Sequence, residues 1–477
     1  RIGFLAGSNV IMSQPLTPIN DEIGQQQPID FFNISSFTVS EADPVDISVA
    51  SVRDVVLFSS LPSRQGIVLF GDNEQFLLYS TDQVISPSTA MIRSLSTWQM
   101  NNKIDPVELD SEFFFITGEA PLNQHARLIK MVVRGMEEDP VCTDVSKSVS
   151  QWIPSEIYQM QSSTQEQFVT LAINGKDLYF YRYFKENGEV VMKAWFKWRY
   201  DVCEQIVFHT VINGNLYTVL KTEPEADEAT TERRVQVCFT QLTTSISNDV
   251  LDPSLNNAPA PFLSIKPNLD LYTVVDSAEM KGGKTQITLD DEYPSLDNNK
   301  FLPFLLLAAN DIPRSMQYEN ISAGFGVPMV YNATDDKYET KENIDLTASS
   351  AKMVFGFLYR FQIDLPTLYY RGQEVDYAAR LNVARCKFEC SAGLQGALAF
   401  QLRADGYPDF DTTFEVTDAD MYDADNAPLV KTRVFEVPIN KLNLTYTLNA
   451  VSDSPFPVAL NSMTWEGNYS PRFYRRL

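Results

Sequence analysis

One acidic stretch carries side chains whose type and spacing could hold a metal ion. From Asp418 to Asp425, carboxylates recur at intervals of two, three and two residues, and oxygen ligands of this kind suit calcium. The stretch lacks the turn glycine and the distal glutamate of an EF-hand loop, which favours a solvated acidic loop. A second acidic run, Glu223 to Glu228, lies between two strand-like segments and is predicted to be an exposed hairpin loop. We predict no cofactor and no metal.

The two histidines offer little to a catalytic or metal site. His125 and His209 each lie beside or within a strand-like stretch, and neither has another ligand at a metal-binding spacing. We expect both to be partly exposed strand histidines without a chemical role. The sequence contains no Gly-rich phosphate loop and no Gly-x-Ser-x-Gly nucleophile elbow. Two carboxylates could serve a glycosidase, but 62 acidic residues make some suitable pair inevitable. The sequence therefore predicts a protein that is not an enzyme.

The cysteines do not indicate a disulfide framework. They are five in number and scattered along the chain: Cys142, Cys203, Cys238, Cys386 and Cys390. The run around Cys386 and Cys390 alternates like a strand, in which four residues span about 13 Å. A disulfide requires Cα atoms within about 7 Å of each other. We therefore predict that Cys386 and Cys390 are reduced and lie on one face of a strand.

Charge and hydropathy exclude two classes of protein. The chain has 38 Lys plus Arg against 62 Asp plus Glu, a net charge of −24, whereas a protein that grips DNA phosphates needs clustered cations. The longest apolar run, Phe301 to Ala309, has nine residues and contains a proline, against the roughly 20 needed to cross a bilayer. The N-terminal residues also lack the order of features of a signal peptide. We expect neither a DNA-gripping protein nor a membrane span.

Short aromatic and β-branched runs bounded by turn residues predict a mostly β chain. In the first half, hairpin turns recur at positions 73, 118, 175 and 214, which are 45, 57 and 39 residues apart. Two of these turns are Asn-Gly, whose backbone suits the favoured hairpin turn. Spacings of 40 to 50 residues are typical of propeller blades. We predict a β-propeller-like domain, whole or incomplete at its N-terminus, over residues 1–245. A β-sandwich is the alternative, and Glu137 to Pro154 is predicted to be an acidic loop.

A second all-β domain is expected after a proline-rich boundary. The polar stretch between Thr243 and Pro267 predicts a linker over residues 246–267, and residues 268–477 are predicted to form an antiparallel β-sandwich or platform. The expected strands alternate between apolar and polar residues, as in a sheet with one wet face. They cover Met353–Ile363, Arg380–Cys390, Ala397–Leu402 and Arg433–Val437.

Both ends of the chain resemble one protein family. The opening Arg1-Ile-Gly-Phe-Leu-Ala-Gly-Ser-Asn-Val-Ile-Met-Ser13, the segments Asp43–Ala50 and Leu69–Phe76, and the closing Trp465-Glu466-Gly467-Asn468-Tyr469 carry the likeness. The closing motif is followed by Arg472, Arg475 and Arg476. In these features the chain is similar to the tail tubular protein B, or nozzle, family of podoviruses. The resemblance covers most of the chain and is weakest over residues 220–350.

The resemblance implies a structural role in the phage tail. It implies a homo-hexameric ring below the tail adaptor ring, next to the tail fibres, with propeller-like domains around a channel for double-stranded DNA. Loops of such channels hold the genome before ejection. In that family the opening residues lie well inside the chain, so we do not expect Arg1 to be the biological start. The net charge predicts a lumen lined by Asp and Glu, along which DNA slides without sequence-specific binding.

The closing motif is predicted to be a structural feature and a subunit contact. Trp465 is expected to anchor the end of the sandwich in a core, while Arg472, Arg475 and Arg476 offer a basic patch to an acidic neighbour. Two other functions remain open from the sequence. One is a receptor- or carbohydrate-binding β protein of the virion, such as a tail fibre or spike, and the other is a propeller enzyme.

Overall fold

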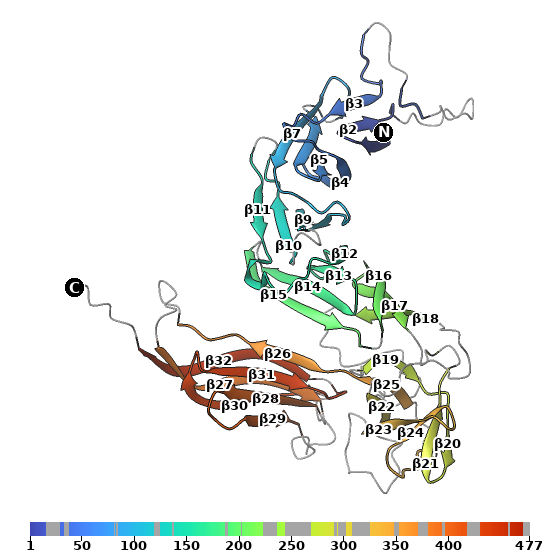
Figure 1. The fold of residues 1–477 in the computed structure, drawn as a ribbon, viewed down its shortest axis with the longest axis vertical. Helices are drawn as coiled ribbons and strands as arrows, with labels where there is room; N and C mark the ends of the chain where they lie inside the picture. Colours follow the sequence, from blue (N-terminus) through green and yellow to red (C-terminus); the bar gives the residue numbers. More distant parts are fainter. Residues whose placement is uncertain are drawn as a thin grey trace, which may run out of the picture. The chain divides into compact units, whose positions relative to one another are not determined.

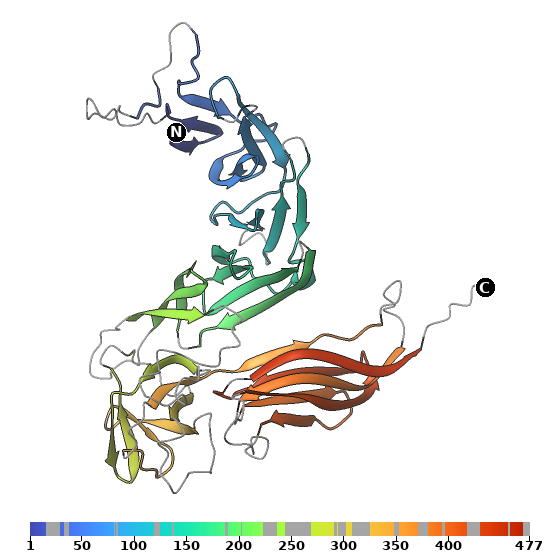
Figure 2. The ribbon, with the colours of Figure 1, turned by 180° about the vertical axis from the view of Figure 1, so that it is seen from behind.

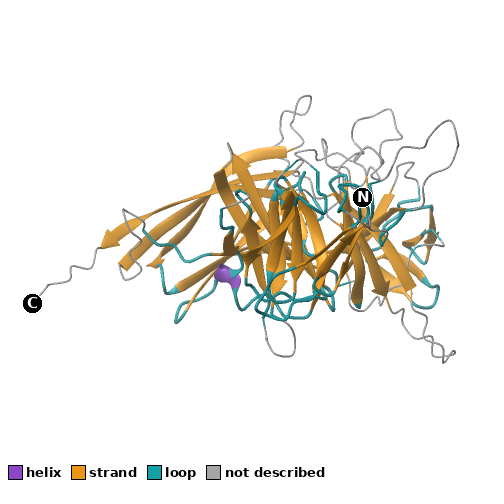
Figure 3. Ribbon diagram, turned by 90° about the horizontal axis from the view of Figure 1, so that it is seen from above, coloured by secondary structure: helices purple, strands orange, loops and turns teal. Residues whose placement is uncertain are grey.

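The computed structural model divides into two compact units, Arg1–Ser245 and Ile246–Leu477, which are described in turn. The residues that it describes are 1–15, 29–32, 38–80, 82, 84–118, 125–135, 138–186, 189–201, 203–222, 236–243, 269–290, 293, 302–307, 325–347, 353–370, 380–393, 396–416, 430–456 and 458–470. Within these ranges the regular secondary structure is almost all strand, as predicted, and the 3-10 turn η1 (Lys147–Val149) is the only helical element (Figure 3). None of them contains a helix long and apolar enough to span a bilayer.

The first unit consists of five successive antiparallel sheets, each made of strands that are consecutive in the chain (Figure 1). The first sheet contains β1 (Gly3–Ala6), β2 (Asn9–Met12) and β3 (Val45–Ser48). The second contains β4 (Leu57–Ser63), β5 (Gly66–Gly71), β6 (Gln75–Ser80) and β7 (Ala90–Ser96). The third contains β8 (Val107–Leu109), β9 (Glu112–Thr117), β10 (Arg127–Val132) and β11 (Val141–Asp144). The fourth contains β12 (Ile157–Ser163), β13 (Phe168–Ile173), β14 (Asp177–Glu186) and β15 (Glu189–Arg199), and the fifth contains β16 (Gln205–Ile212), β17 (Asn215–Thr222) and β18 (Gln236–Thr243).

The predicted hairpins are confirmed as pairs of neighbouring strands. They are β5–β6, β9–β10, β13–β14 and β16–β17, and the first three form the middle of their sheets. At the last turn, Asn213 and Gly214 have φ values of 51° and 75°, which Asn and Gly tolerate best. The expected loop over Glu137 to Pro154 is wrong in part, because β11 and η1 lie inside it. The backbone of β10 bonds to β11 over four residue pairs, from Ile129 opposite Asp144 to Val132 opposite Val141.

Hydrophobic cores lie between successive sheets, so that an inner sheet buries both of its faces. On β9, Phe113 and Phe115 pack with Phe70 of the second sheet, at ring-centroid distances of 6.2 Å. Phe114, on the other face of β9, packs 6.2 Å from Tyr181 of the fourth sheet. A propeller would require its blades to stack in this way. Among the described residues, no core cluster joins the first sheet to the fifth, so closure into a propeller remains a prediction.

The second unit begins with a seven-stranded antiparallel sheet in the order β19-β25-β22-β23-β24-β21-β20. Its strands are β19 (Leu269–Val274), β20 (Ser277–Lys281), β21 (Lys284–Thr288), β22 (Leu302–Leu307), β23 (Phe325–Asn332), β24 (Lys337–Thr340) and β25 (Met353–Leu358). Buried aromatic rings pack on one another within this sheet: Tyr338 lies 4.4 Å from Phe355, which lies 5.5 Å from Phe357. The linker predicted over residues 246–267 lies outside the described residues.

The same unit continues into a β-sandwich, as its alternating strands predict (Figure 2). One sheet has the order β26-β31-β28-β29 and the other the order β30-β27-β32. The strands are β26 (Phe361–Leu365), β27 (Arg380–Gly393), β28 (Ala397–Ala404), β29 (Phe410–Glu415), β30 (Val430–Leu442), β31 (Tyr446–Ser452) and β32 (Val458–Ser470). Both sheets contribute to one core, in which Phe388 of β27 stacks 4.4 Å from Phe400 of β28.

Two predictions about individual strands have opposite outcomes. The single strand expected over Met353–Ile363 is wrong, because β25 and β26 belong to different sheets and separate at Tyr359 and Arg360. β25 is buried at five consecutive positions, whereas every residue of β26 is exposed or only partly buried. Cys386 and Cys390, in contrast, are free and buried on β27, as predicted. Burial raises the pKa of each thiol to about 11, which keeps both protonated and unreactive at neutral pH.

Candidate functional site

The residues Trp465–Tyr469, here called the C-terminal clasp, form part of the long strand β32. This strand pairs with β27 along almost its full length, with Trp465 opposite Cys386 and Tyr469 opposite Leu381. Because side chains alternate along a strand, Trp465 and Tyr469 project to one face while Glu466 and Asn468 project to the other. The clasp therefore presents one apolar face and one polar face.

The apolar face of the clasp packs on the sandwich. Trp465 and Tyr469 are half-buried against the core that contains Phe388 and Leu381. The ring of Tyr469 also lies 4.4 Å from that of Tyr370, which precedes β27 in the chain. An aromatic ring of this size contributes a large apolar contact area, so the two side chains fix β32 to the rest of the unit.

The polar face carries a ladder of ion pairs across three strands. Glu466 of β32 accepts hydrogen bonds from Arg385 Nε at 2.7 Å and Lys387 Nζ at 2.5 Å, both on β27. Arg385 also donates from Nη1 to Glu436 of β30 at 2.8 Å. The hydrogen bonds from Lys387 and Arg385 lower the pKa of Glu466. These groups are about half exposed, so water and salt screen the ladder strongly.

Gly467 allows the clasp to lie close to β27. A Cβ atom at this position would lie 2.4 Å from the carbonyl oxygen of Asn382, which is inside the contact limit for carbon and oxygen. The register between the two strands shifts at the same place, between Val383 and Arg385. The glycine is thus required by the close backbone approach at this irregularity.

The structure does not bring all predicted site residues together. Trp465, Glu466, Gly467, Asn468 and Tyr469 share one strand, and Asn468 is exposed on it. Three further groups lie outside the described residues, and their predictions stay untested: Arg472, Arg475 and Arg476; the acidic stretch Asp418–Asp425; and the acidic run Glu223–Glu228. Among the residues that the structure does describe, no cluster of three or more His, Cys, Asp or Glu side chains is arranged to hold a metal.

The expectation for the histidines is half wrong. His209 is fully buried, and its Nε2 lies 2.8 Å from the hydroxyl of Thr170 on the neighbouring fourth sheet. Its Nδ1 has no hydrogen-bond partner among the described residues, and burial lowers the pKa of the ring from 6.5 to about 4. The imidazole is therefore neutral at physiological pH and acts as a core residue. His125 is exposed and lies at an isolated β-bridge to Pro154.

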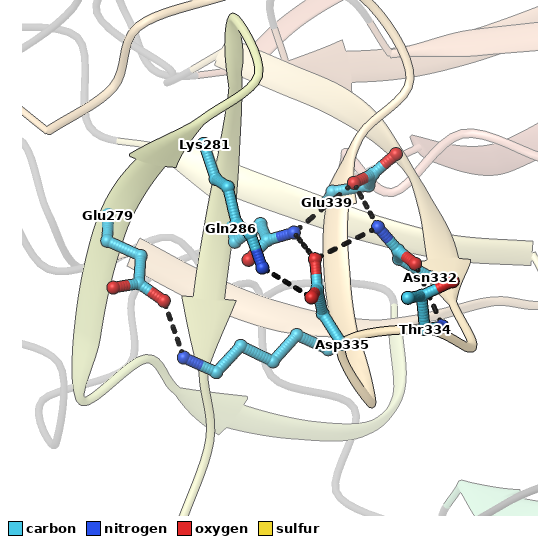
Figure 4. Close-up of polar contacts among 8 residues, drawn as sticks. Glu279, Lys281, Gln286, Asn332, Thr334, Asp335 and Glu339 are labelled. Atoms are coloured by element: carbon cyan, nitrogen blue, oxygen red, sulfur yellow. Dashed lines mark hydrogen bonds and ion pairs between the residues drawn. The ribbon is translucent and has the colours of Figure 1, made fainter.

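A network of ion pairs and amides in the seven-stranded sheet was not anticipated from the sequence (Figure 4). Lys337 Nζ lies 2.7 Å from Glu279. Outside the view of Figure 4, Lys284 Nζ lies 2.6 Å from Glu339. Lys281 pairs with Asp335, which also accepts a hydrogen bond from Gln286 at 2.7 Å. Asn332 donates to Glu339 at 2.9 Å.

This network braces the hairpins instead of forming a cation site, because lysine and amide donors occupy the carboxylate oxygens. The hydrogen bond from Lys284 lowers the pKa of Glu339, and the one from Lys281 lowers that of Asp335. The alternation of Lys and Glu along these strands is the only signal in the sequence that could have indicated it. It cannot specify which strands lie side by side.

Comparison with solved structures adds no argument about the fold. An exo-β-1,3-galactanase from Phanerochaete chrysosporium is 8% identical, with a TM-score of 0.21 over 86% of this chain and 95% of that chain. A xylan β-1,4-xylosidase from Bacillus halodurans is 7% identical, with a TM-score of 0.17 over 87% of this chain and 91% of that chain. Similarities this low do not bear on the activity of the chain.

Comparison by sequence identifies the family of the chain. The tail tubular protein gp12 of Escherichia phage T7 is 22% identical over 226 residues, which are 47% of this chain and 27% of that protein. The match thus spans about a quarter of the length of this relative. Residues 1–476 match the family described as bacteriophage nozzle protein, which covers both units and the C-terminal clasp. The chain therefore belongs to the bacteriophage nozzle protein family.

Proposed function

We propose that the chain is a structural subunit of the tail nozzle in the virion of a short-tailed bacteriophage, with no catalytic role. The observation that carries this proposal is the family match over residues 1–476. The likeness to a tail tubular protein of phage T7 supports it. In this role the protein forms part of the wall of a channel, and it acts through its shape and its contacts with neighbouring subunits.

The nozzle is proposed to be a ring of six copies around a channel that retains the genome and conducts it during ejection. The tail adaptor ring, the tail fibres and the passing double-stranded DNA would be its neighbours. The net charge of −24 supports a lumen that repels DNA, since repulsion between like charges acts over a Debye length of about 8 Å at physiological salt. Acidic walls would let the duplex slide without specific binding.

The C-terminal clasp is proposed to make a subunit contact in this ring. Its apolar face is occupied by the sandwich core, whereas the polar face, with the ion pairs of Glu466, Arg385 and Lys387, is exposed to a neighbour. The arginines that follow, Arg472, Arg475 and Arg476, would add positive charge beside it. Such a pairing suits a neighbour that is as acidic as this chain.

Electron microscopy of the recombinant chain and of purified particles tests the proposal. We expect six copies around an axial channel, with lumen walls that carry mainly Asp and Glu. A lumen lined mainly by Lys and Arg would refute the sliding mechanism while leaving the ring intact. A monomer that cleaves a polysaccharide would overturn the proposed function itself.

A further inference from the structure

The outer edge of β15 is an open surface for another strand. β15 has 11 residues and is the last strand of the fourth sheet, where it pairs with β14. Within the ranges that the structure describes, no other strand bonds to its outer edge. Residues 189–194 are exposed at every position, including Met192, which is 59% exposed. A long, exposed edge with apolar side chains is a site at which another polypeptide can pair.

One face of this edge carries a row of cations. In the pairing of β14 with β15, Lys193 lies opposite Tyr183, Trp195 opposite Tyr181 and Lys197 opposite Tyr179. The three tyrosines belong to one core cluster, so Lys193, Trp195 and Lys197 project to that same face. Arg199 follows at the next alternate position, opposite Asp177.

The row contains three cations, Lys193, Lys197 and Arg199, against two nearby carboxylates, Asp177 and Asp201. Asp177 accepts from Arg199 Nε at 2.7 Å and from Lys197 Nζ at 3.4 Å, so one carboxylate serves two cations. Lys193 is exposed and makes no ion pair with any described residue. This excess stands out in a chain with a net charge of −24.

The opposite face of the edge is apolar near its exposed end. Met192 lies opposite Phe184, and both side chains are more than half exposed. Farther along this face, Ala194 lies opposite Arg182, which is paired with Glu166, and Phe196 packs on the core of the fifth sheet. A strand that added to β15 would therefore meet cations on one face and apolar side chains on the other.

Lysines on an edge strand also serve to prevent unwanted pairing, because like charges on two such edges repel. The same charges select for one kind of partner. A second copy of β15 would set a row of cations near another row of cations. A strand with carboxylates at alternate positions would neutralise them and would place its intervening side chains on Met192 and Phe184.

We propose that the outer edge of β15 binds an extended acidic segment of a partner protein, which adds to the fourth sheet as a further strand. Its carboxylates face Lys193, Lys197 and Arg199, and its apolar residues alternate with them. Main-chain hydrogen bonds supply affinity and the two faces supply specificity. This inference does not depend on the proposed ring.

The test uses the full chain and a labelled ten-residue peptide that alternates Glu and Val. We expect saturable binding below about 1 mM, and none for a peptide that alternates Lys and Val. The double variant Lys193→Glu with Lys197→Glu should weaken binding by at least about fivefold. The matched control Arg64→Glu, an exposed arginine in the turn between β4 and β5, should leave binding unchanged.

A version of the Glu-Val peptide that is N-methylated at every residue distinguishes strand addition from charge attraction alone. It keeps its carboxylates but has no main-chain N–H donor on either edge, so it should lose binding in either strand direction. Undiminished binding of the methylated version, equal binding of the Lys-Val peptide, or no binding at about 1 mM would overturn the proposal. Self-association of the chain that the double variant abolishes would overturn it in favour of a second copy.

Discussion

The five-sheet unit and the sandwich bury their hydrophobic residues in different ways. In the first unit each core lies between two successive sheets, and the residues that share it are close in the sequence. In the sandwich one core is enclosed by two sheets, and β27 pairs with strands that follow much later in the chain. The first arrangement couples each sheet mainly to its neighbours, as in repeat proteins, while the second makes seven strands depend on one core.

The largest expected effects come from paired cavity mutations, Phe388→Ala in the sandwich and Phe180→Ala between the fourth and fifth sheets. Both side chains are buried, and each loss should cost about 3–5 kcal/mol. Measured by hydrogen exchange, the first variant should lose protection in both sandwich sheets. The second should lose it in the fourth and fifth sheets only. Equal loss in the first sheet would show that the five-sheet unit unfolds as one block, and Phe388→Leu serves as the milder control.

The next effect is a loss of stability in acid that is confined to the five-sheet unit. Burial lowers the pKa of His209 from 6.5 to about 4, so the unfolded chain takes up the proton first. The contribution of neutral His209 to the free energy of unfolding is fully present above pH 6.5. It decreases as the pH falls towards 4, and below pH 4 the loss levels off at about 3 kcal/mol. Urea unfolding at several pH values measures the dependence of the free energy of unfolding on pH, and this slope should be smaller in His209→Gln. The exposed control His125→Gln should keep it, and identical slopes in both variants would contradict the assignment.

A smaller effect is expected where the clasp lies against β27. In Gly467→Ala the added methyl group would collide with the carbonyl of Asn382, which should cost the sandwich about 1–3 kcal/mol. Thermal unfolding of the variant should show the loss, with Asn468→Ala, the exposed neighbour, as the control. If Gly467→Ala and Asn468→Ala had the same Tm, the close approach at Gly467 would not contribute to stability.

The smallest effect is expected on the polar face of the clasp. Glu466→Gln removes the carboxylate that Arg385 and Lys387 share, but these groups are exposed to water. We expect a drop in Tm smaller than that of Gly467→Ala, which vanishes in about 1 M salt as the charges are screened. A drop that persists in high salt would show that Glu466 has a packing role. If the clasp contacts a neighbouring subunit, the assembled ring should be more sensitive than the isolated chain.

Local signals in the sequence predicted the parts of the fold that local chemistry determines. Asn213-Gly214 predicted a hairpin because Asn and Gly readily adopt the backbone angles of that turn. The alternation of side chains around Cys386 predicted a strand with two cysteines on one face. Three strands of the sandwich, β27, β28 and β30, were found in the same way. These features depend on residues within a few positions of one another.

The remaining features depend on partners distant in the sequence. The break between β25 and β26 is decided by which sheet each half joins, which the alternation cannot reveal. His209 is buried because Thr170 of another sheet faces it, and the ion network around Asp335 and Glu339 requires two hairpins to lie side by side. The clasp was found as a motif, but the need for glycine at position 467 became evident only from the backbone of β27.

The order of strands in the sheet β30-β27-β32 bears on how the chain is made. The central strand, β27, leaves the ribosome before either of its partners, since β30 begins at Val430 and β32 at Val458. Until both have been synthesised, an alternating apolar strand has two unpaired edges. A nascent chain that stalls in this interval presents a ready template for aggregation, and the arrival of the clasp ends that period of exposure.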